Sequence, residues 1–275
     1  MTEAEREAPA EDDWRCYRHP DRAAGVRCRR CERPICPDCM VTAPVGFQCP
    51  SCVKGAPAVR TMRSLQAASR PIVSSVLVAV NLALFVPTLG DNRLIGDLGL
   101  FGPAVAAGEW WRLVTSGFMH VNLVHVGFNC LLLWQLGGLL EPALGRVRFA
   151  LLYTVALLAG AVGVLLLDPL ALTAGASGAV FGLMGAAVIG LRQRGINPMQ
   201  SGLGGLLIVN LVLTFAVPGI SIGGHLGGLA GGAALGAHLL AGDSTPAART
   251  ASAVVAGAAA AALFVAGLWL ASNPV

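Results

Sequence analysis

The fold of this chain is decided by the stretch Gly175-Ala176-Ser177-Gly178-Ala179-Val180-Phe181-Gly182. It opens an apolar run over about 177–191 that carries no charge before Arg192. A serine between small residues at the start of an apolar helix can place its hydroxyl against a neighbouring helix, and small neighbours let another backbone approach closely. Taken alone, such a serine is more often a packing residue, so its meaning depends on the rest of the chain.

The composition is that of a membrane protein. Of 275 residues, 55% are apolar and only 12% are charged, whereas soluble domains carry about 25% charged residues. The 35 glycines indicate helices that pack closely through small residues. Residues 1–15 have no apolar core of the kind a cleavable signal peptide needs, so we expect the first membrane helix to act as its own insertion signal.

Seven apolar segments predict an all-α fold, a polytopic membrane bundle of helices. Most of the segments approach the roughly 20 residues that a helix needs to cross a bilayer. The fourth and fifth are shorter, which suits helices buried inside the bundle. The segments cover about residues 71–89, 119–140, 148–167, 177–191, 202–217, 224–241 and 251–271.

Arginines predict the orientation of this bundle. They precede the first segment, and they lie between the second and third, after the fourth, and between the sixth and seventh, whereas loops 168–176 and 218–223 have none. The positive-inside rule then places a multi-pass protein in the cell membrane with its N-terminus in the cytosol and its C-terminus outside. The connection 90–118 is an exception because it holds Arg93 and Arg112; its length predicts structure of its own.

The N-terminal part contains seven cysteines and one histidine in four pairs. The two-residue gap in each pair lets both side chains reach one tetrahedral metal ion. Eight ligands fill two zinc sites with none left over. Disulfides are the alternative, but they require an oxidising compartment, and no visible segment exports this part of the chain. The predicted ligands are Cys16, His19, Cys28, Cys31, Cys36, Cys39, Cys49 and Cys52.

These ligands define a predicted zinc-binding module over residues 14–53, between a disordered N-terminus (1–13) and a basic linker (54–70). So short a module has little core, so zinc binding should supply most of its folding energy. The spacing leaves open whether the first pair joins the third and the second the fourth, or whether neighbours join. Because four protein ligands close each site, both ions are predicted to be structural, and we expect no cofactor for catalysis.

The spacing is similar to that of B-box-like and other treble-clef-like zinc modules. Arginines surround its second pair of ligands, and for a module tethered to a membrane we expect them to form a solvated surface or to meet anionic lipid headgroups. We do not expect nucleic-acid binding. A protein partner of unknown identity is expected for this module. The arginines are Arg27, Arg29, Arg30 and Arg33.

Polar residues inside the membrane part fall at one depth. His125 and Asn129 are four residues apart and share a helix face in the outer half, while Ser177 and His225 begin the fourth and sixth segments on the same side. Polar residues inside a membrane are costly and are by default functional. Singly, each histidine is more often a hydrogen-bonding residue between helices; the common depth favours a functional site.

Glycines explain how these groups could meet. Gly224, Gly228, Gly232 and Gly236 recur every fourth residue, and the fourth segment has small residues at the same period. Two such faces can pack backbone to backbone, which would bring the Ser177 hydroxyl within the roughly 3 Å of an imidazole that activation of a nucleophile requires. No carboxylate is placed to orient His225, so we infer a Ser–His dyad.

Four motifs together resemble the rhomboid intramembrane serine proteases. They are Trp111-Arg112, His125-x-x-x-Asn129, Gly-Ala-Ser177-Gly and Gly-His225-Leu-Gly-Gly, in this order. The resemblance covers about residues 71–241. It implies a core of six transmembrane helices over 71–241, with 250–272 as a seventh.

For the site, the resemblance implies that Ser177 is the nucleophile and His225 the general base. His125, Asn129 and the Ser177 amide would stabilise the oxyanion. The expected activity is cleavage of transmembrane segments of membrane proteins near the outer face of the bilayer. Arg112 and Glu141 match positions that the resemblance makes structural.

Two alternatives compete with a protease. An inactive rhomboid-like protein that binds transmembrane clients usually lacks the serine or the histidine, and both are present here. A channel or transporter would need polar residues that continue to the cytosolic side. Below Asn129, Ser177 and His225 the segments are almost entirely apolar or small, which argues against a conduit.

Overall fold

The computed structural model describes residues 14–43, 46–54, 70–241 and 245–274. The chain divides into two compact units, Met1–Leu65 and Gln66–Val275. The predicted disordered segment 1–13 and all but the two ends of the predicted linker 54–70 lie outside the described residues.

The N-terminal unit is built from two short hairpins. Strand β1 (Val26–Arg27) pairs with β2 (Pro34–Ile35), and β3 (Val41–Thr42) pairs with β4 (Phe47–Gln48), both antiparallel. A 3-10 turn η2 (Pro37–Cys39) and helix α1 (Pro50–Lys54) follow β2 and β4. In the described part of the unit the buried apolar side chains are five cysteines and Ile35. Its interior is therefore made of thiols, which fits a unit held together by metal.

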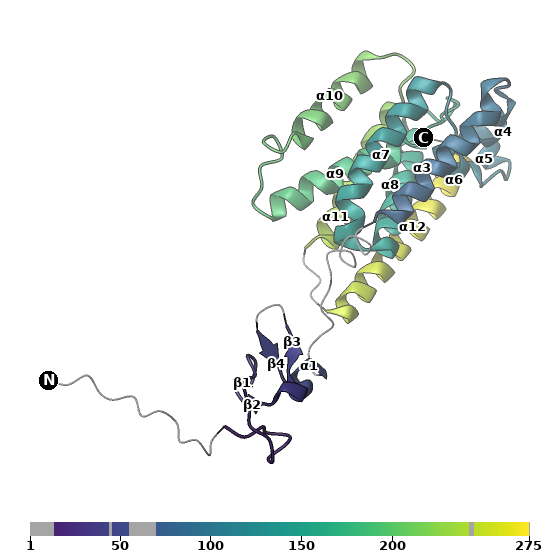
Figure 1. The fold of residues 1–275 in the computed structure, drawn as a ribbon. Helices are drawn as coiled ribbons and strands as arrows, with labels where there is room; N and C mark the ends of the chain where they lie inside the picture. Colours follow the sequence, from purple (N-terminus) through teal and green to yellow (C-terminus); the bar gives the residue numbers. More distant parts are fainter. Residues whose placement is uncertain (1–13, 44–45, 55–69, 242–244, 275) are drawn as a thin grey trace. The chain divides into compact units, whose positions relative to one another are not determined.

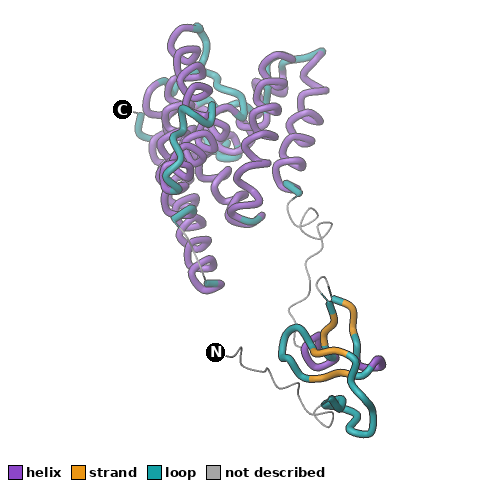
Figure 2. Tube along the Cα trace, turned by 60° about the vertical axis from the view of Figure 1, so that its left-hand side comes forward, coloured by secondary structure: helices purple, strands orange, loops and turns teal. Residues whose placement is uncertain are grey.

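The second unit is a bundle of helices (Figure 1), and the strands of the described residues, orange in Figure 2, all lie in the first. Four helical segments are long and apolar enough to cross a membrane: Ile72–Leu89, Leu123–Leu144, Arg146–Leu167 and Pro246–Ser272. The elements are α3 (Ile72–Phe85), η3 (Val86–Leu89), α4 (Arg93–Leu98), α5 (Gly102–Ala106), α6 (Arg112–Thr115), η4 (Ser116–Phe118), α7 (Leu123–Leu144), α8 (Arg146–Leu167), α9 (Ser177–Gln193), α10 (Leu203–Ala216), α11 (Ile222–Leu239) and α12 (Pro246–Ser272).

Glycines bring α11 against α8 and α9 at the centre of the bundle. A Cβ on Gly232 would overlap the backbone of Gly182, and one on Gly236 would lie 2.5 Å from the Ala186 Cβ. On the other side of α11, a Cβ on Gly223 would overlap the Gly163 carbonyl of α8. The predicted packing of α9 on α11 through small residues is therefore confirmed, and the same helix also packs on α8 in this way.

Helix α10 differs from the prediction. Its short length suggested a helix inside the bundle, but α10 lies at the edge (Figure 1), and Gly204 and Thr214 are its buried residues. Except for Asn210 and Thr214, the side chains of α10 are apolar, as in a helix whose outer faces meet lipid. Length alone does not distinguish such a helix from a buried one. Of the two short helices, only α9 is largely buried.

The connection 90–118 has structure of its own, as predicted: it forms α4, α5, α6 and η4. Arg112 fixes it by donating to the carbonyls of Gly96 (2.6 Å) and Gly99 (2.8 Å) and to the Glu109 carboxylate (2.6 Å). The Glu141 carboxylate accepts from the backbone N–H groups of Val73 and Ser74 at 2.9 Å each and so caps α3. These contacts of Arg112 and Glu141 are structural.

The second apolar segment becomes helical later than expected. It was predicted from residue 119, but α7 begins at Leu123, because the Asn122 side chain accepts from the His125 N–H at 2.8 Å and caps the helix. An asparagine oxygen at this position satisfies one of the free N–H groups of a first turn. Met119 and His120 are therefore held outside the helix, in the bend that leads into it.

Candidate functional site

Ser177 and His225 are in direct contact. Ser177 is the first residue of α9, and its Oγ lies 2.7 Å from Nε2 of His225, in the first turn of α11. Ser221 caps that turn by accepting from the Gly224 N–H at 3.0 Å. The glycine contacts between α9 and α11 set the short helix separation that this hydrogen bond requires.

The loop that leads into Ser177 is tight and is held by backbone hydrogen bonds. Gly175 in this loop has φ +138°, and its N–H donates to the Ser116 carbonyl at 2.9 Å. A Cβ on Gly175 would lie 2.6 Å from Cε1 of His125. The loop is also paired with the first connection through Leu100 and Thr173, which exchange two backbone hydrogen bonds of 2.8 Å. Glycine is required at residue 175 by both its backbone conformation and the close His125 ring.

Two side chains fix the His225 ring. Phe181 stacks on it with ring centroids 4.1 Å apart and planes 20° apart. Thr214 on α10 places its Oγ1 2.7 Å from Nδ1 of His225. The group that faces Nδ1 is therefore a neutral hydroxyl, in agreement with the absence of a carboxylate that the sequence indicated.

Sequence reasoning missed Thr214. Its signal was weak: Thr214 and Asn210 are the polar residues of the apolar run 203–216, and they are four apart and so share one helix face. Nothing in that spacing shows that this face turns toward His225.

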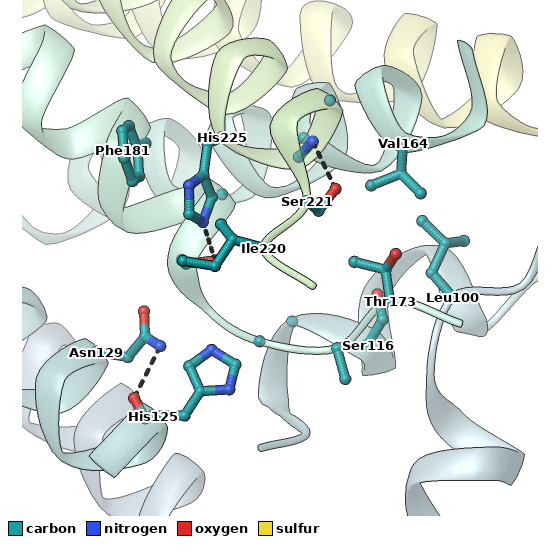
Figure 3. Close-up of a pocket in the computed structure, with 18 of the residues that line it drawn as sticks. Leu100, Ser116, His125, Asn129, Val164, Thr173, Phe181, Ile220, Ser221 and His225 are labelled. Atoms are coloured by element: carbon teal, nitrogen blue, oxygen red, sulfur yellow. Dashed lines mark hydrogen bonds between the residues drawn. The ribbon is translucent and has the colours of Figure 1, made fainter. Parts of the chain in front are cut away.

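His125 and Asn129 lie across the cavity from His225, as Figure 3 shows. Both are on α7, and the Asn129 Nδ2 donates to the His125 carbonyl at 3.0 Å. Ser177, His225, His125 and Asn129 all line one cavity of about 1000 Å³. The structure therefore brings together all four residues that the sequence singled out in the membrane part.

His120 supports the loop before Ser177. It is fully buried, and its Nε2 accepts from the Ala176 N–H at 3.4 Å. Its ring packs edge-on against that of His125, with centroids 4.9 Å apart. Cys130, the cysteine outside the four pairs, is buried with Phe85 and Val126 and faces a helix contact.

The predicted metal ligands form two groups. Within each group the four ligand atoms lie within 4.8 Å of one another. The first and third pairs come together and the second and fourth come together, so the structure selects the cross-braced scheme over the sequential one. The groups are Cys16, His19, Cys36 and Cys39, and Cys28, Cys31, Cys49 and Cys52.

The ligand atoms fit a tetrahedral zinc ion. Ligands bound at about 2.0–2.3 Å in a tetrahedron lie roughly 3.3–3.8 Å apart; here Nδ1 of His19 is 3.4 Å from the sulfurs of Cys36 and Cys39, and Cys31 is 3.8 Å from Cys49. All eight cysteines of the chain are free thiols. Burial raises the pKa of the Cys28 thiol, but backbone N–H groups, first that of Cys49, outweigh burial and lower the pKa to about 6. In the same group, hydrogen bonds with Cys31 and Cys49 raise the pKa of the Cys52 thiol to about 12.

The fold and the two sites define a class: a polytopic membrane protein with a paired serine and histidine, preceded by a Cys/His zinc-binding module. Residues 107–242 match the rhomboid domain, and residues 11–43 match the B-box zinc finger. The chain carries a rhomboid domain and, N-terminal to it in the sequence, a zinc module of B-box type. The B-box match ends before Cys49, so the structure rather than the match adds the last pair to the second metal group.

The chain is similar to rhomboid proteins of bacteria and plants. It is 37% identical over 171 residues to rhomboid protease GluP of Bacillus subtilis, which is 59% of this chain and 34% of that protein. YdcA of the same bacterium is 36% identical over 131 residues, 46% of this chain and 66% of YdcA. RHOMBOID-like protein 4 of Arabidopsis thaliana is 36% identical over 165 residues, 56% of this chain and 41% of that protein. The chain thus spans about a third to two thirds of the length of these relatives.

Proposed function

We propose that this protein is an intramembrane serine endopeptidase that cleaves transmembrane segments of membrane proteins. The observation that carries the proposal is the 2.7 Å contact between Ser177 Oγ and His225 Nε2, which joins α9 and α11 in a unit whose described residues include four helical segments long and apolar enough to cross a membrane. A serine becomes a nucleophile when an adjacent base can take its proton, and hydrogen-bond contact with an imidazole is the required geometry. The relative GluP carries the name of a rhomboid protease, which supports this reading.

In the proposed reaction, Ser177 Oγ attacks the carbonyl carbon of the scissile peptide bond while its proton moves to His225 Nε2. The carbonyl oxygen becomes an oxyanion, and the proposed groups that stabilise it are the Ser177 N–H and the side chains of His125 and Asn129. His225 then gives its proton to the leaving amine, and water hydrolyses the acyl-enzyme. One Asn129 N–H is bound to the His125 carbonyl, which leaves the second N–H of that amide available to a substrate.

The proposed site opens near the outer face of the bilayer. Arginines flank alternate ends of the helices, and the positive-inside rule then puts the N-terminus and the zinc module in the cytosol and the C-terminus outside. Ser177 and His225 both begin helices at the arginine-poor end. Water reaches a peptide bond most easily at that depth, so cleavage is expected close to the outer boundary of the substrate's membrane segment.

The zinc module is proposed to hold two structural ions. Its two groups of four ligands leave no ligand position for a metal-bound water. We therefore assign bond cleavage to Ser177 and His225 alone and give the module a role in folding and in contacts with a protein partner.

The test uses the purified full-length chain in detergent, a single-pass model substrate and a fluorophosphonate that labels activated serines. We expect labelling at Ser177 and cleavage near the outer membrane boundary of the substrate. Ser177→Ala and His225→Ala should abolish turnover, because the dyad acts as a unit. Asn129→Ala should lower kcat by roughly 10²–10³-fold through loss of an oxyanion donor.

Two matched variants control this test. Ser75→Ala removes an exposed hydroxyl on α3, and His238→Ala removes an exposed ring in the last turn of α11. Both should retain wild-type cleavage. Normal cleavage by either dyad variant would remove the protease assignment. A folded wild-type protein that neither cleaves nor labels would instead favour a rhomboid-like protein that binds transmembrane clients.

A further inference from the structure

The His225 ring lies between two hydroxyl groups. Ser177 Oγ is 2.7 Å from Nε2, and Thr214 Oγ1 is 2.7 Å from Nδ1. His225 is 8% exposed and Thr214 is 2% exposed. Each ring nitrogen therefore has one protein partner in a buried setting, and the proton of the neutral ring must lie on one of them.

The surroundings of Thr214 decide where that proton lies. Its Oγ1 is also 2.8 Å from the carbonyl oxygen of Asn210, one turn earlier on α10. A carbonyl oxygen only accepts hydrogen bonds, and a hydroxyl has a single proton to donate. If the Thr214 hydroxyl donates to Asn210, it must accept from His225, so Nδ1 carries the ring proton. Nε2 is then unprotonated and accepts the hydrogen bond of Ser177.

The opposite arrangement satisfies fewer contacts. If the Thr214 hydroxyl donated to Nδ1, two oxygens with no proton between them would face each other across 2.8 Å at Asn210. The ring proton would then lie on Nε2, which could not take a proton from Ser177. That arrangement makes one hydrogen bond fewer and sets lone pairs of two oxygens against each other, so the chain of donors from Ser177 through His225 and Thr214 to Asn210 is the favoured state.

We propose that Thr214 is a positioning residue: it holds neutral His225 with its proton on Nδ1, so that Nε2 is ready to accept the Ser177 proton. This inference rests on the proposed function. When Ser177 attacks, its proton moves to Nε2 and the ring becomes a cation, while Nδ1–H stays bonded to the Thr214 oxygen. Thr214 gains and loses no proton. A helix at the edge of the bundle thus supplies the third side chain of the hydrogen-bonded chain that begins at Ser177.

The kinetic test compares three variants on the same model substrate. Thr214→Val keeps the shape but removes the oxygen, which leaves the buried Nδ1–H without an acceptor and favours the wrong tautomer. An unpaired buried donor corresponds to a factor of about 10 to 100 in an equilibrium constant, so kcat should fall about 10- to 100-fold with KM nearly unchanged. Thr214→Ser restores the oxygen and should keep kcat within about threefold of wild type.

Thr154→Val is the matched control. Thr154 on α8 donates to the carbonyl four residues earlier, Ala150, at 2.9 Å, as Thr214 does to Asn210. Its loss should leave kcat near that of the wild type. If Thr214→Val loses no more activity than Thr154→Val, the proposal is overturned.

A spectroscopic readout tests the tautomer without turnover. Full-length protein labelled with ¹⁵N-histidine in detergent micelles reports which ring nitrogen carries the proton, and His225→Ala identifies the His225 signals by their absence. We expect the proton on Nδ1 in wild type and in Thr214→Ser, and a population with the proton on Nε2 in Thr214→Val. A wild-type proton on Nε2 would contradict the proposal even if the enzyme is active, and even if Thr214→Val does not fold. Loss of cleavage and labelling in the wild type would instead contradict the proposed function.

Discussion

A Cβ on Gly228 would overlap the carbonyl of Gly178, so α9 and α11 are in backbone contact beside Ser177 on α9 and about one turn from His225 on α11. This contact sets the distance between the two helices that carry the dyad. Any side chain larger than hydrogen at Gly228 must push them apart. The distance between Ser177 and His225 therefore depends on the absence of a side chain at Gly228, which does not itself contact the reactive atoms.

We predict that Gly228→Ala reduces cleavage at least tenfold. The added methyl meets backbone rather than a flexible side chain, so the helices must separate, and overpacking of this kind costs about 1–3 kcal/mol. A shift of even about 1 Å between nucleophile and base lowers the rate steeply. Cleavage rate and thermal unfolding in detergent measure both effects. Gly257→Ala on α12 is the control, since no atom lies within 4 Å of its Cβ position, and it should be neutral or slightly stabilising.

Gly175→Ala should also inactivate the enzyme, for a different reason. The alanine Cβ would lie 2.6 Å from the His125 ring, and the residue would have to keep φ +138°. The His125 ring must therefore move away from its position in the cavity, where it is proposed to stabilise the oxyanion. We expect kcat to fall about 10²-fold or more, as for loss of an oxyanion donor. Gly108→Ala also needs a positive φ well outside the left-handed helical region, +108°, with no atom within 4 Å of its Cβ position, and should retain activity. An equal fall in kcat in the two variants would show that backbone strain, and not the contact with His125, causes the loss of activity.

Orientation can be tested with cysteines placed on exposed side chains. Leu170 lies in an arginine-poor loop and is 71% exposed, and Ile196 follows Arg192 and Arg194 and is 46% exposed. In intact cells, Leu170→Cys should react with an impermeant thiol reagent and Ile196→Cys should react only after the membrane is opened. The reverse pattern would overturn the proposed orientation and would place the thiol-rich module in an oxidising compartment.

Removing the metal should distinguish the role of the N-terminal unit from that of the membrane unit. We expect about two zinc ions per chain by metal analysis, and one of the two lost in Cys28→Ser/Cys49→Ser, because both residues belong to one ligand group. Chelation should unfold the N-terminal unit, since metal binding supplies its folding energy. Cleavage of the model substrate should stay within about twofold.

The control for that experiment is Cys130→Ser, which removes the buried cysteine outside both groups and should leave the zinc content unchanged. If chelation stops cleavage while the helical signal of the membrane bundle is intact, the zinc module takes part in catalysis and the separation of roles is wrong.

Much of the candidate site could be predicted from spacing. Glycines that recur every fourth residue lie on one helix face. The sequence positions of Gly228, Gly232 and Gly236 therefore predict that α11 packs on α9. The two-residue gap of each zinc pair is likewise a local property, because neighbouring ligands reach one ion only at such a distance.

Contacts between residues far apart in the chain could be established from the three-dimensional fold alone. Local spacing cannot say that Cys16 lies in one ligand group with Cys36 rather than with Cys28. The pairing follows from the hairpin β1–β2, which separates the second pair from the first and third. It also cannot say that Thr214 faces His225, because the rotation of α10 is set by its contacts with other helices. The sequence determined which groups could react. Helix packing, which depends on the whole bundle, decided which groups meet.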